Sequence, residues 1–376
     1  MLSRLVFLGL CVSQFFPAAL PCRAEAAAKA GLTVETGDIA GAKFTLARPA
    51  PWNQRVLLLA HGYRDPNLPL AADLFPEQLA YRTLLDEGWI VAATSYRRNG
   101  IIVADALADL DALRAHIEKK FGAPDRVLLE GESMGGLVVT LMAERDRGLY
   151  SGAIAIGAAL EVKEDNTPIG LNLQPQIPLL FLSNQTELEG PISYLTTKLR
   201  RADYPTQLRP ALFRVSRDGH VNVNQHERLA ALRALNLWLD SGRAALPQPA
   251  SGAPFFDTTV APEPQPSRVV MHVDGHGFDA LVIEVAANYG NVALNAQPAD
   301  FAAAGIAKMT WFQLTAHRQT YRVRYGRDFD SVKRGEWVAF PGADGFFWLS
   351  RNYADAAATA ALKIGDPVTI RRYDEE

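Results

Sequence analysis

Short apolar runs alternate with amphipathic stretches between residues 30 and 240. The runs are continuously apolar and lie at residues 55–60, 89–94, 126–130, 153–156, 178–182 and 211–215. Continuous runs of this length are typical of parallel strands that are covered on both faces. Residues 107–121 and 229–239 instead repeat apolar side chains at three- and four-residue spacing, which predicts helices with one buried face. We therefore predict a doubly wound, mostly parallel α/β sheet, with residues 32–47 as an antiparallel pair at its edge.

The pattern changes after residue 240. Residues 243–267 are rich in proline and have little periodicity, as is typical of a semi-extended linker. Short β-like runs follow at residues 269–273, 281–285, 320–324, 337–340 and 367–370. They predict a small all-β domain, a barrel or a sandwich, over residues 268–376.

The N-terminal residues have the pattern of a secretory signal. A positive start at residues 1–4 precedes an apolar run over residues 5–16, and Ala24 and Ala26 provide the small residues that a signal peptidase needs. A membrane-spanning helix needs roughly 20 apolar residues, and Gln14 and Pro17 interrupt this run too early. We therefore expect a signal peptide over 1–26, an α/β domain over 27–242, a linker over 243–267 and the β domain. The mature protein would be periplasmic or secreted, with no stable membrane insertion.

Composition and charge narrow the class of ligand. A formal net charge of −3 argues against a nucleic-acid partner and leaves small molecules or short polymers. Both cysteines, Cys11 and Cys22, fall in the predicted signal segment, so we expect neither a disulfide nor thiol chemistry in the mature chain. The sequence contains no metal-ligand cluster and no phosphate-binding loop, and we expect no metal and no cofactor.

One motif carries nucleophilic chemistry. Residues 131–136 (GESMGG) lie directly after a predicted strand and before an apolar helix. A sharp strand-to-helix turn of this kind needs glycines around the central residue and lifts Ser133 to the carboxyl edge of the sheet, where it would act as the nucleophile. The amide of Met134 would then stabilise an oxyanion. His61-Gly62-Tyr63 follows another strand; there the Tyr63 amide would be the second oxyanion donor and His61 would hold the loop.

A serine nucleophile needs a base and an acid. His116 and His226 lie on predicted helices, and three further histidines belong to the second domain. His220 instead lies in a loop between the last strand and the final helix of the first domain, which makes it the predicted base. The acid should follow the strand at 178–182, where Glu187 has the better spacing and Glu189 is the alternative; Asp218 stays a third possibility.

These motifs resemble the α/β-hydrolase superfamily, and in particular exported bacterial esterases and peptidases related to prolyl oligopeptidases. The resemblance covers residues 55–240 and rests on residues 60–63 (AHGY), 94–100 (TSYRRNG) and 131–136. It implies acyl transfer to water through a Ser133–His220–Glu187 triad, with Glu where the family commonly has Asp, and it places residues 94–100 near the pocket. We expect a carboxylic ester as substrate; a peptide cleaved by the same triad is the alternative.

The C-terminal part resembles the smaller β domain of the S-adenosylmethionine hydrolase and halogenase family. The matching stretches are residues 324–326, 333–338, 349–352 and 362–368. In that family the domain contributes to an adenosine pocket shared with a larger domain, which this chain does not carry. The resemblance implies a nucleoside contact at Arg351 and Asn352, and a ligand-binding protein acting through this domain is a further alternative. A packing, glycan-binding or surface-binding module is the interpretation we favour.

Overall fold

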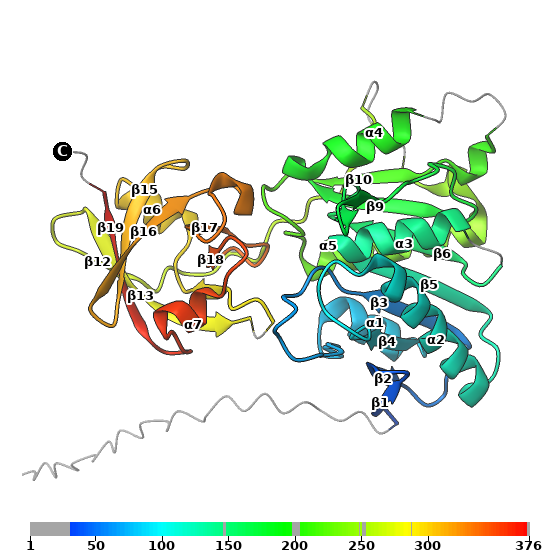
Figure 1. The fold of residues 1–376 in the computed structure, drawn as a ribbon. Coiled ribbons are helices and arrows are strands. Elements are labelled where there is room, and N and C mark those ends of the chain that lie inside the picture. Colours follow the sequence, from blue (N-terminus) through cyan, green and yellow to red (C-terminus); the bar gives the residue numbers. More distant parts are fainter. Residues whose placement is uncertain are drawn as a thin grey trace, which may run out of the picture.

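The computed structural model describes residues 31–145, 148–197, 204–247, 249, 253–286 and 288–373, which form two sheets with separate cores (Figure 1). The predicted signal peptide, and both cysteines with it, lie outside the described residues. The predicted fold class is confirmed in both parts. No helix in the described ranges is long and apolar enough to cross a membrane.

The first sheet has nine strands in the order β1-β2-β4-β3-β5-β6-β9-β10-β11. Their bounds are Thr33–Ile39 (β1), Ala42–Arg48 (β2), Arg55–Ala60 (β3), Ile90–Thr94 (β4), Arg126–Glu132 (β5), Gly152–Ile156 (β6), Leu179–Asn184 (β9), Ala211–Val215 (β10) and Phe256–Asp257 (β11). β1 pairs antiparallel with β2, and β2 antiparallel with β4, whereas the remaining neighbours are parallel. The predicted sheet with its antiparallel edge pair is therefore confirmed.

Helices cover both faces of this sheet. α2 (Val103–Phe121) and α3 (Met134–Arg145) pack on one face, and α1 (Leu79–Asp86) and α5 (Gln225–Ser241) on the other. Consecutive residues of β3 point to opposite faces, because Leu57 lies in the core under α1 and α5 and Leu58 in the core under α2 and α3. Each fully buried leucine contributes roughly 1.5–3 kcal/mol, so both faces stabilise the sheet.

Short elements complete this half of the chain. The two-stranded hairpin of β7 (Lys163–Glu164) and β8 (Thr167–Pro168) follows β6, and α4 (Glu189–Thr197) follows a 3₁₀ turn at Gln185–Glu187. Further 3₁₀ turns are Thr206–Leu208 and Arg243–Ala245.

The segment predicted as a linker is in part a component of the first sheet, and this aspect of the prediction was wrong. β11 lies within residues 243–267 and pairs parallel with β10. The ring of Phe256 packs on Phe213 with 5.4 Å between ring centroids, and Leu246 is buried in the core beside α5. Proline excludes a residue from donating to a sheet, but the two residues of β11 are not proline and can extend the edge.

The second sheet closes into a barrel. Seven strands form the ring β13-β14-β18-β17-β16-β15-β19, which closes because β19 pairs with β13, and β12 adds to β13 from outside. The bounds are Val270–Met271 (β12), Gly277–Val285 (β13), Val292–Leu294 (β14), Trp311–Ala316 (β15), Gln319–Tyr325 (β16), Trp337–Pro341 (β17), Phe347–Arg351 (β18) and Pro367–Arg372 (β19). Neighbouring strands are antiparallel except β16 and β17.

The barrel is filled by aromatic side chains. Phe301 of α6 (Pro298–Ala303) stacks on Phe347 at 3.8 Å between centroids and lies edge-on to Phe278 and Phe312. α7 (Ala356–Ala360) packs beside β18, and a 3₁₀ turn at Phe329–Ser331 lies between β16 and β17. The sequence pattern located β12, β13, β16, β17 and β19 but not β14, β15, β18 or either helix.

Candidate active site

Ser133 occupies a strained turn between β5 and α3. Its φ of 55° is in the left-handed region, which side chains other than glycine rarely adopt. The two flanking glycines make the turn possible: a Cβ on Gly131 would lie 2.1 Å from the carbonyl oxygen of Gly135, and one on Gly135 would lie 2.0 Å from that of Ala60. The structure therefore has the predicted turn, with Ser133 at the carboxyl edge of the sheet.

The structure brings the three predicted catalytic side chains together. His220 Nε2 lies 2.7 Å from Ser133 Oγ, and its Nδ1 hydrogen-bonds Oε1 of Glu187. Glu187 follows β9 directly, and its carboxylate also accepts from the amide of Val221 at 3.3 Å. Gly157 leaves room for this carboxylate, because a Cβ there would lie 2.9 Å from Oε1.

The two alternative acids lie elsewhere. Glu189 is the first residue of α4 and is exposed. Asp218 pairs with Lys308 of the barrel and accepts from Gln185 at 2.7 Å. Among the described residues, neither carboxylate contacts His220, whereas that of Glu187 does.

Electrostatics adjust His220 for base chemistry. Burial lowers the pKa of His220, but the hydrogen bond and charge of Glu187, with the charges of Asp330 and Glu132, outweigh burial and raise it above 6.5. The raised pKa makes the imidazole a stronger base than free histidine. Asp330 belongs to the barrel, so a charge from the second sheet acts on this site.

The loop that carries His220 is fixed by side-chain amides. Asn184, fully buried at the end of β9, donates to the carbonyl of Asn222 at 2.8 Å and accepts from its amide at 2.7 Å. Asn222 in turn donates to the carbonyls of Asp218 at 2.7 Å and of Pro341, in the barrel, at 2.9 Å. The loop is therefore held from both sheets.

The segments that carry the predicted oxyanion donors, Tyr63 and Met134, both lie next to Ser133. Met134 is the first residue of α3, so its N–H has no acceptor within the helix. Gly62 approaches Ser133 so closely that a Cβ there would lie 3.0 Å from the Cβ of Ser133, so the loop that carries Tyr63 passes beside the nucleophile. Two such amides are suited to stabilising a negative oxygen next to Ser133.

His61, which is expected from the sequence to hold this loop, contacts it through Nδ1. Burial and, next, the charge of Arg64 lower its pKa to about 4, so the ring is neutral near neutral pH. In that state Nδ1 donates to the carbonyl of Gly62 at 2.7 Å. Tyr96, fully buried in the 94–100 segment, packs its ring at a tilt against that of His61, with 4.1 Å between centroids, and its hydroxyl donates to the carbonyl of His61 at 3.1 Å. Tyr96 therefore packs against the 61–63 loop through His61.

A buried ionic network behind the turn was not predicted. Arg228 of α5, almost fully buried, pairs with Glu130 and with Glu132, the residues three and one before Ser133. The hydroxyl of Tyr81 donates to Glu130 at 2.8 Å. Burial raises the pKa of Glu130, which Arg228 opposes. The sequence did hold a signal, because Glu130 is a carboxylate at the end of an otherwise apolar strand.

Arg351 and Asn352, for which the resemblance implies a nucleoside contact, hydrogen-bond to other residues of the barrel. Arg351 donates to the carbonyl of Gly335 at 2.7 Å and to Thr359 at 2.8 Å, and Asn352 donates to that of Val332 at 3.0 Å. Both side chains tie down the loop between β16 and β17. This arrangement does not favour a nucleoside contact at either residue.

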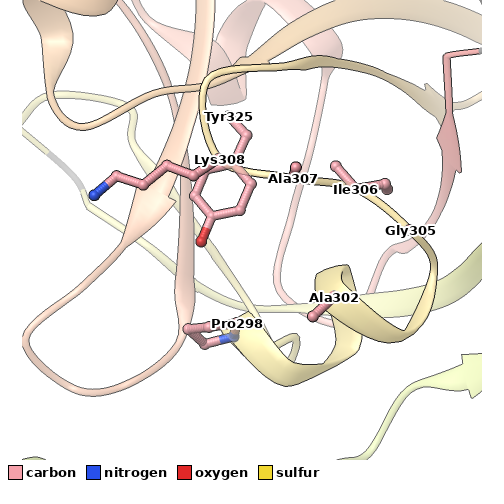
Figure 2. Close-up of a pocket in the computed structure, with 7 residues that line it drawn as sticks. All are labelled: Pro298, Ala302, Gly305, Ile306, Ala307, Lys308 and Tyr325. Carbon is pink, nitrogen blue, oxygen red and sulfur yellow. The ribbon is translucent and has the colours of Figure 1, made fainter.

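Two hollows are associated with the barrel. One, of about 360 Å³, is lined by Pro298, Ala302, Gly305, Ile306, Ala307, Lys308 and Tyr325 (Figure 2). It contains none of the three catalytic candidates. The other, of about 790 Å³, lies between the sheets and is lined by Gln185, Thr186, Asp218, Met309, Arg327, Asp328, Asp330 and Ser331. Thr186 and Asp218 are close in sequence to Glu187 and His220, so this second cavity adjoins the candidate site.

In the part of the chain that the structure describes, no group of three or more His, Cys, Asp or Glu side chains could hold a metal ion.

Family comparisons agree with both folds. Residues 102–203 match the family described as serine aminopeptidase, S33. The first domain has an α/β-hydrolase fold. Residues 280–369, within the barrel, match the family described as SAM hydroxide adenosyltransferase C-terminal domain. No curated protein sequence matches this chain.

Solved structures similar to this chain include proteins of different kinds. An uncharacterised conserved protein from Thermotoga maritima shares 23% identity, over 28% of this chain and 39% of its own, with a TM-score of 0.26. A protein assigned as a dienelactone hydrolase from Klebsiella pneumoniae shares 16% identity, over 56% of this chain and 99% of its own, with a TM-score of 0.43. A post-proline cleaving enzyme from Rickettsia typhi shares 13% identity, over 56% of this chain and 37% of its own, with a TM-score of 0.42. The chain thus spans well under half of the first and third proteins.

Proposed function

We propose that this α/β-hydrolase is an exported serine hydrolase that cleaves a carboxylic ester through an acyl-enzyme. The observation that carries the proposal is the continuous chain of contacts from Ser133 Oγ through His220 to Glu187. A serine hydroxyl becomes a nucleophile when an adjacent base, itself oriented by a third group, can take its proton.

The proposed reaction has two halves. Ser133 Oγ attacks the ester carbonyl carbon while His220 Nε2 takes the hydroxyl proton, and the new oxyanion accepts hydrogen bonds from the Tyr63 and Met134 amides. Collapse of this intermediate breaks the bond to the alcohol, which leaves with the proton from His220. A water then attacks the acyl-enzyme, His220 again takes the proton, and the acid is released as Ser133 is restored.

A peptide is the second candidate substrate, and the match to the serine aminopeptidase family favours it. An aminopeptidase must also bind the substrate's ammonium group, for which a free carboxylate close to the nucleophile is suited. Glu132, the carboxylate adjacent to Ser133 in sequence, is paired with Arg228 and is not free for that task. This pairing is why an ester is the substrate we favour.

Hydrolysis of paired substrates tests the proposal. The purified chain is assayed with a 4-nitrophenyl ester and with 4-nitroanilides of amino acids and short peptides, with Ser133→Ala as the control. We expect the ester to be hydrolysed far faster, and the Ser133→Ala variant to be inactive on both. Faster cleavage of an anilide would favour the peptidase, and equal activity of the variant would contradict the serine mechanism.

Export is proposed from the N-terminal pattern alone, and a periplasmic or secreted location follows from it. Expression of the full chain in a bacterium, followed by fractionation and N-terminal sequencing, should find the protein outside the cytoplasm and cleaved after Ala26. Full-length protein in the cytoplasm would contradict this part of the proposal.

A further inference from the structure

The barrel contacts the α/β-hydrolase on both sides of Ser133. On the histidine side, Asn222 donates to the carbonyl of Pro341 at 2.9 Å, and Asp218 pairs with Lys308. On the oxyanion side, the ring of Tyr353 packs edge-on to that of Tyr63, with 5.8 Å between centroids. The barrel is therefore anchored to both loops that flank the nucleophile.

One loop of the barrel extends between these two groups of contacts. The β16–β17 loop, residues 326–336, begins at the cavity beside the site, which Arg327, Asp328 and Asp330 help to line. The charge of Asp330 acts on His220, whereas that of Arg334, four residues later, acts on Tyr63. The loop thus extends from the base to the oxyanion side of the site.

Tyr353 and Arg334 form a preorganised pair. The guanidinium of Arg334 lies over the ring of Tyr353, 4.7 Å from its centroid. Arg351 holds the carbonyl of Gly335, and the amide of Gly335 donates to the carbonyl of Asn352 at 2.7 Å, so the segments that carry the pair are tied together. Tyr353 has a φ of 55° and is 62% exposed, an uncommon backbone conformation for a bulky side chain. Strain of this kind clusters at binding sites.

The cation of this pair is available to a ligand. Among the described residues, no carboxylate lies within ion-pair distance of the Arg334 guanidinium, whose recorded contact is with the Tyr353 ring. Asp65 is the carboxylate that also faces Tyr63, and it accepts from both the amide and the side chain of Asn67 at 2.8 Å. A planar guanidinium on an aromatic ring is well suited to a carboxylate, which it binds through two parallel hydrogen bonds.

We propose that the β16–β17 loop forms one wall of the substrate site. Arg334, held over the ring of Tyr353, binds a carboxylate carried by the substrate. The inference rests on the proposed serine hydrolase and deepens it. The preferred substrate is then an ester with an anionic group on its acyl or alcohol side. The barrel becomes the part of the protein that determines specificity.

Matched substrates test this role in the full mature chain. For the acyl side, 4-nitrophenyl hexanoate is compared with the 4-nitrophenyl monoester of adipic acid; for the alcohol side, phenyl acetate is compared with 4-carboxyphenyl acetate. Uncatalysed rates are subtracted. We expect kcat/KM to favour the charged member of at least one pair by about tenfold or more, and high salt to reduce the preference.

The variants separate recognition from catalysis. Arg334→Gln should lose most of the preference, because kcat/KM should fall several-fold more on the charged ester than on the neutral one. Arg334→Lys should keep part of the preference, because a point charge binds carboxylates less specifically. Arg318→Gln, at an exposed arginine in the turn between β15 and β16, should behave as wild type. No preference in the wild type, or equal losses on both esters in Arg334→Gln, would overturn the inference. If no ester is hydrolysed through Ser133, the proposed function fails, and this inference fails with it.

Discussion

Nε2 of His220 lies 2.7 Å from Oγ of Ser133, although the two residues are 87 positions apart in the chain. The sheet explains this proximity. β5 and β10 are parallel strands of one sheet, so the residues that follow them emerge at the same carboxyl edge. Ser133 follows β5 directly, and the loop after β10 reaches back to it. The sheet therefore assembles the site from distant segments.

The pH dependence of hydrolysis should reflect the raised pKa of His220. Only the unprotonated imidazole can take the proton of Ser133, so kcat/KM should rise with pH, with a midpoint above the ordinary value of 6.5. Burial lowers the pKa of His220, and Glu187 is the main group that raises it. Glu187→Gln should therefore lower the midpoint of the pH profile, and kcat should drop by about 10³- to 10⁴-fold. A pH–rate profile of both proteins measures the two effects. A wild-type midpoint below 6.5 would contradict this account of the site.

Gly135 should tolerate no side chain. Gly135→Ala would place a Cβ 2.0 Å from the carbonyl oxygen of Ala60, so the variant should lose about 3 kcal/mol or more of unfolding free energy, with most of its activity. Gly170→Ala is the matched control, because a Cβ there has no atom within 4 Å. Urea denaturation compares the two variants. Similar stabilities would mean that the turn is not packed as described.

Arg228 should be more important for stability than an exposed arginine. Arg228→Met leaves the buried carboxylate of Glu130 without its cation, which should cost about 3–5 kcal/mol of unfolding free energy. The double variant Arg228→Met/Glu130→Leu removes both charges and should recover much of this loss. Thermal and urea unfolding measure both. A single variant as stable as wild type would show that the network does not support the nucleophile turn.

Lys308 should position the histidine loop from the barrel. Lys308→Met removes the partner of Asp218, and since Lys308 is half exposed, solvent screening limits the effect to about 1 kcal/mol, or about fivefold, in kcat. KM for a small neutral ester should change less than kcat, and Lys308→Arg should restore the rate. Steady-state kinetics checks this. A loss confined to KM would mean that Lys308 contacts substrate instead of supporting the loop.

Much of the first domain could be predicted because its signals are local. A continuous apolar run specifies a buried parallel strand, and the GESMGG turn around Ser133 needs glycine at fixed offsets, so strand and nucleophile were both accessible from sequence. Glu187 could be favoured over Glu189 from its spacing after the strand.

The rest depended on contacts between distant segments. Neither the pairing of β11 with β10 nor the burial of Arg228 follows from local pattern, because each depends on which surface the segment meets in the folded chain. The contact between Tyr353 and Tyr63 depends on how the barrel is seated, for which the sequence holds no periodic signal. Short alternating runs in the barrel were detectable, whereas β14, with three buried residues, was too short to stand out.

Labelling with a fluorophosphonate tests the central claim most directly. The probe reacts covalently with a serine whose hydroxyl is activated by a neighbouring base. We predict a single adduct on the peptide that contains Ser133, absent in Ser133→Ala and strongly slowed in His220→Ala. An unlabelled wild-type protein, or an adduct on another serine that persists in Ser133→Ala, would contradict the assignment of Ser133 as the nucleophile.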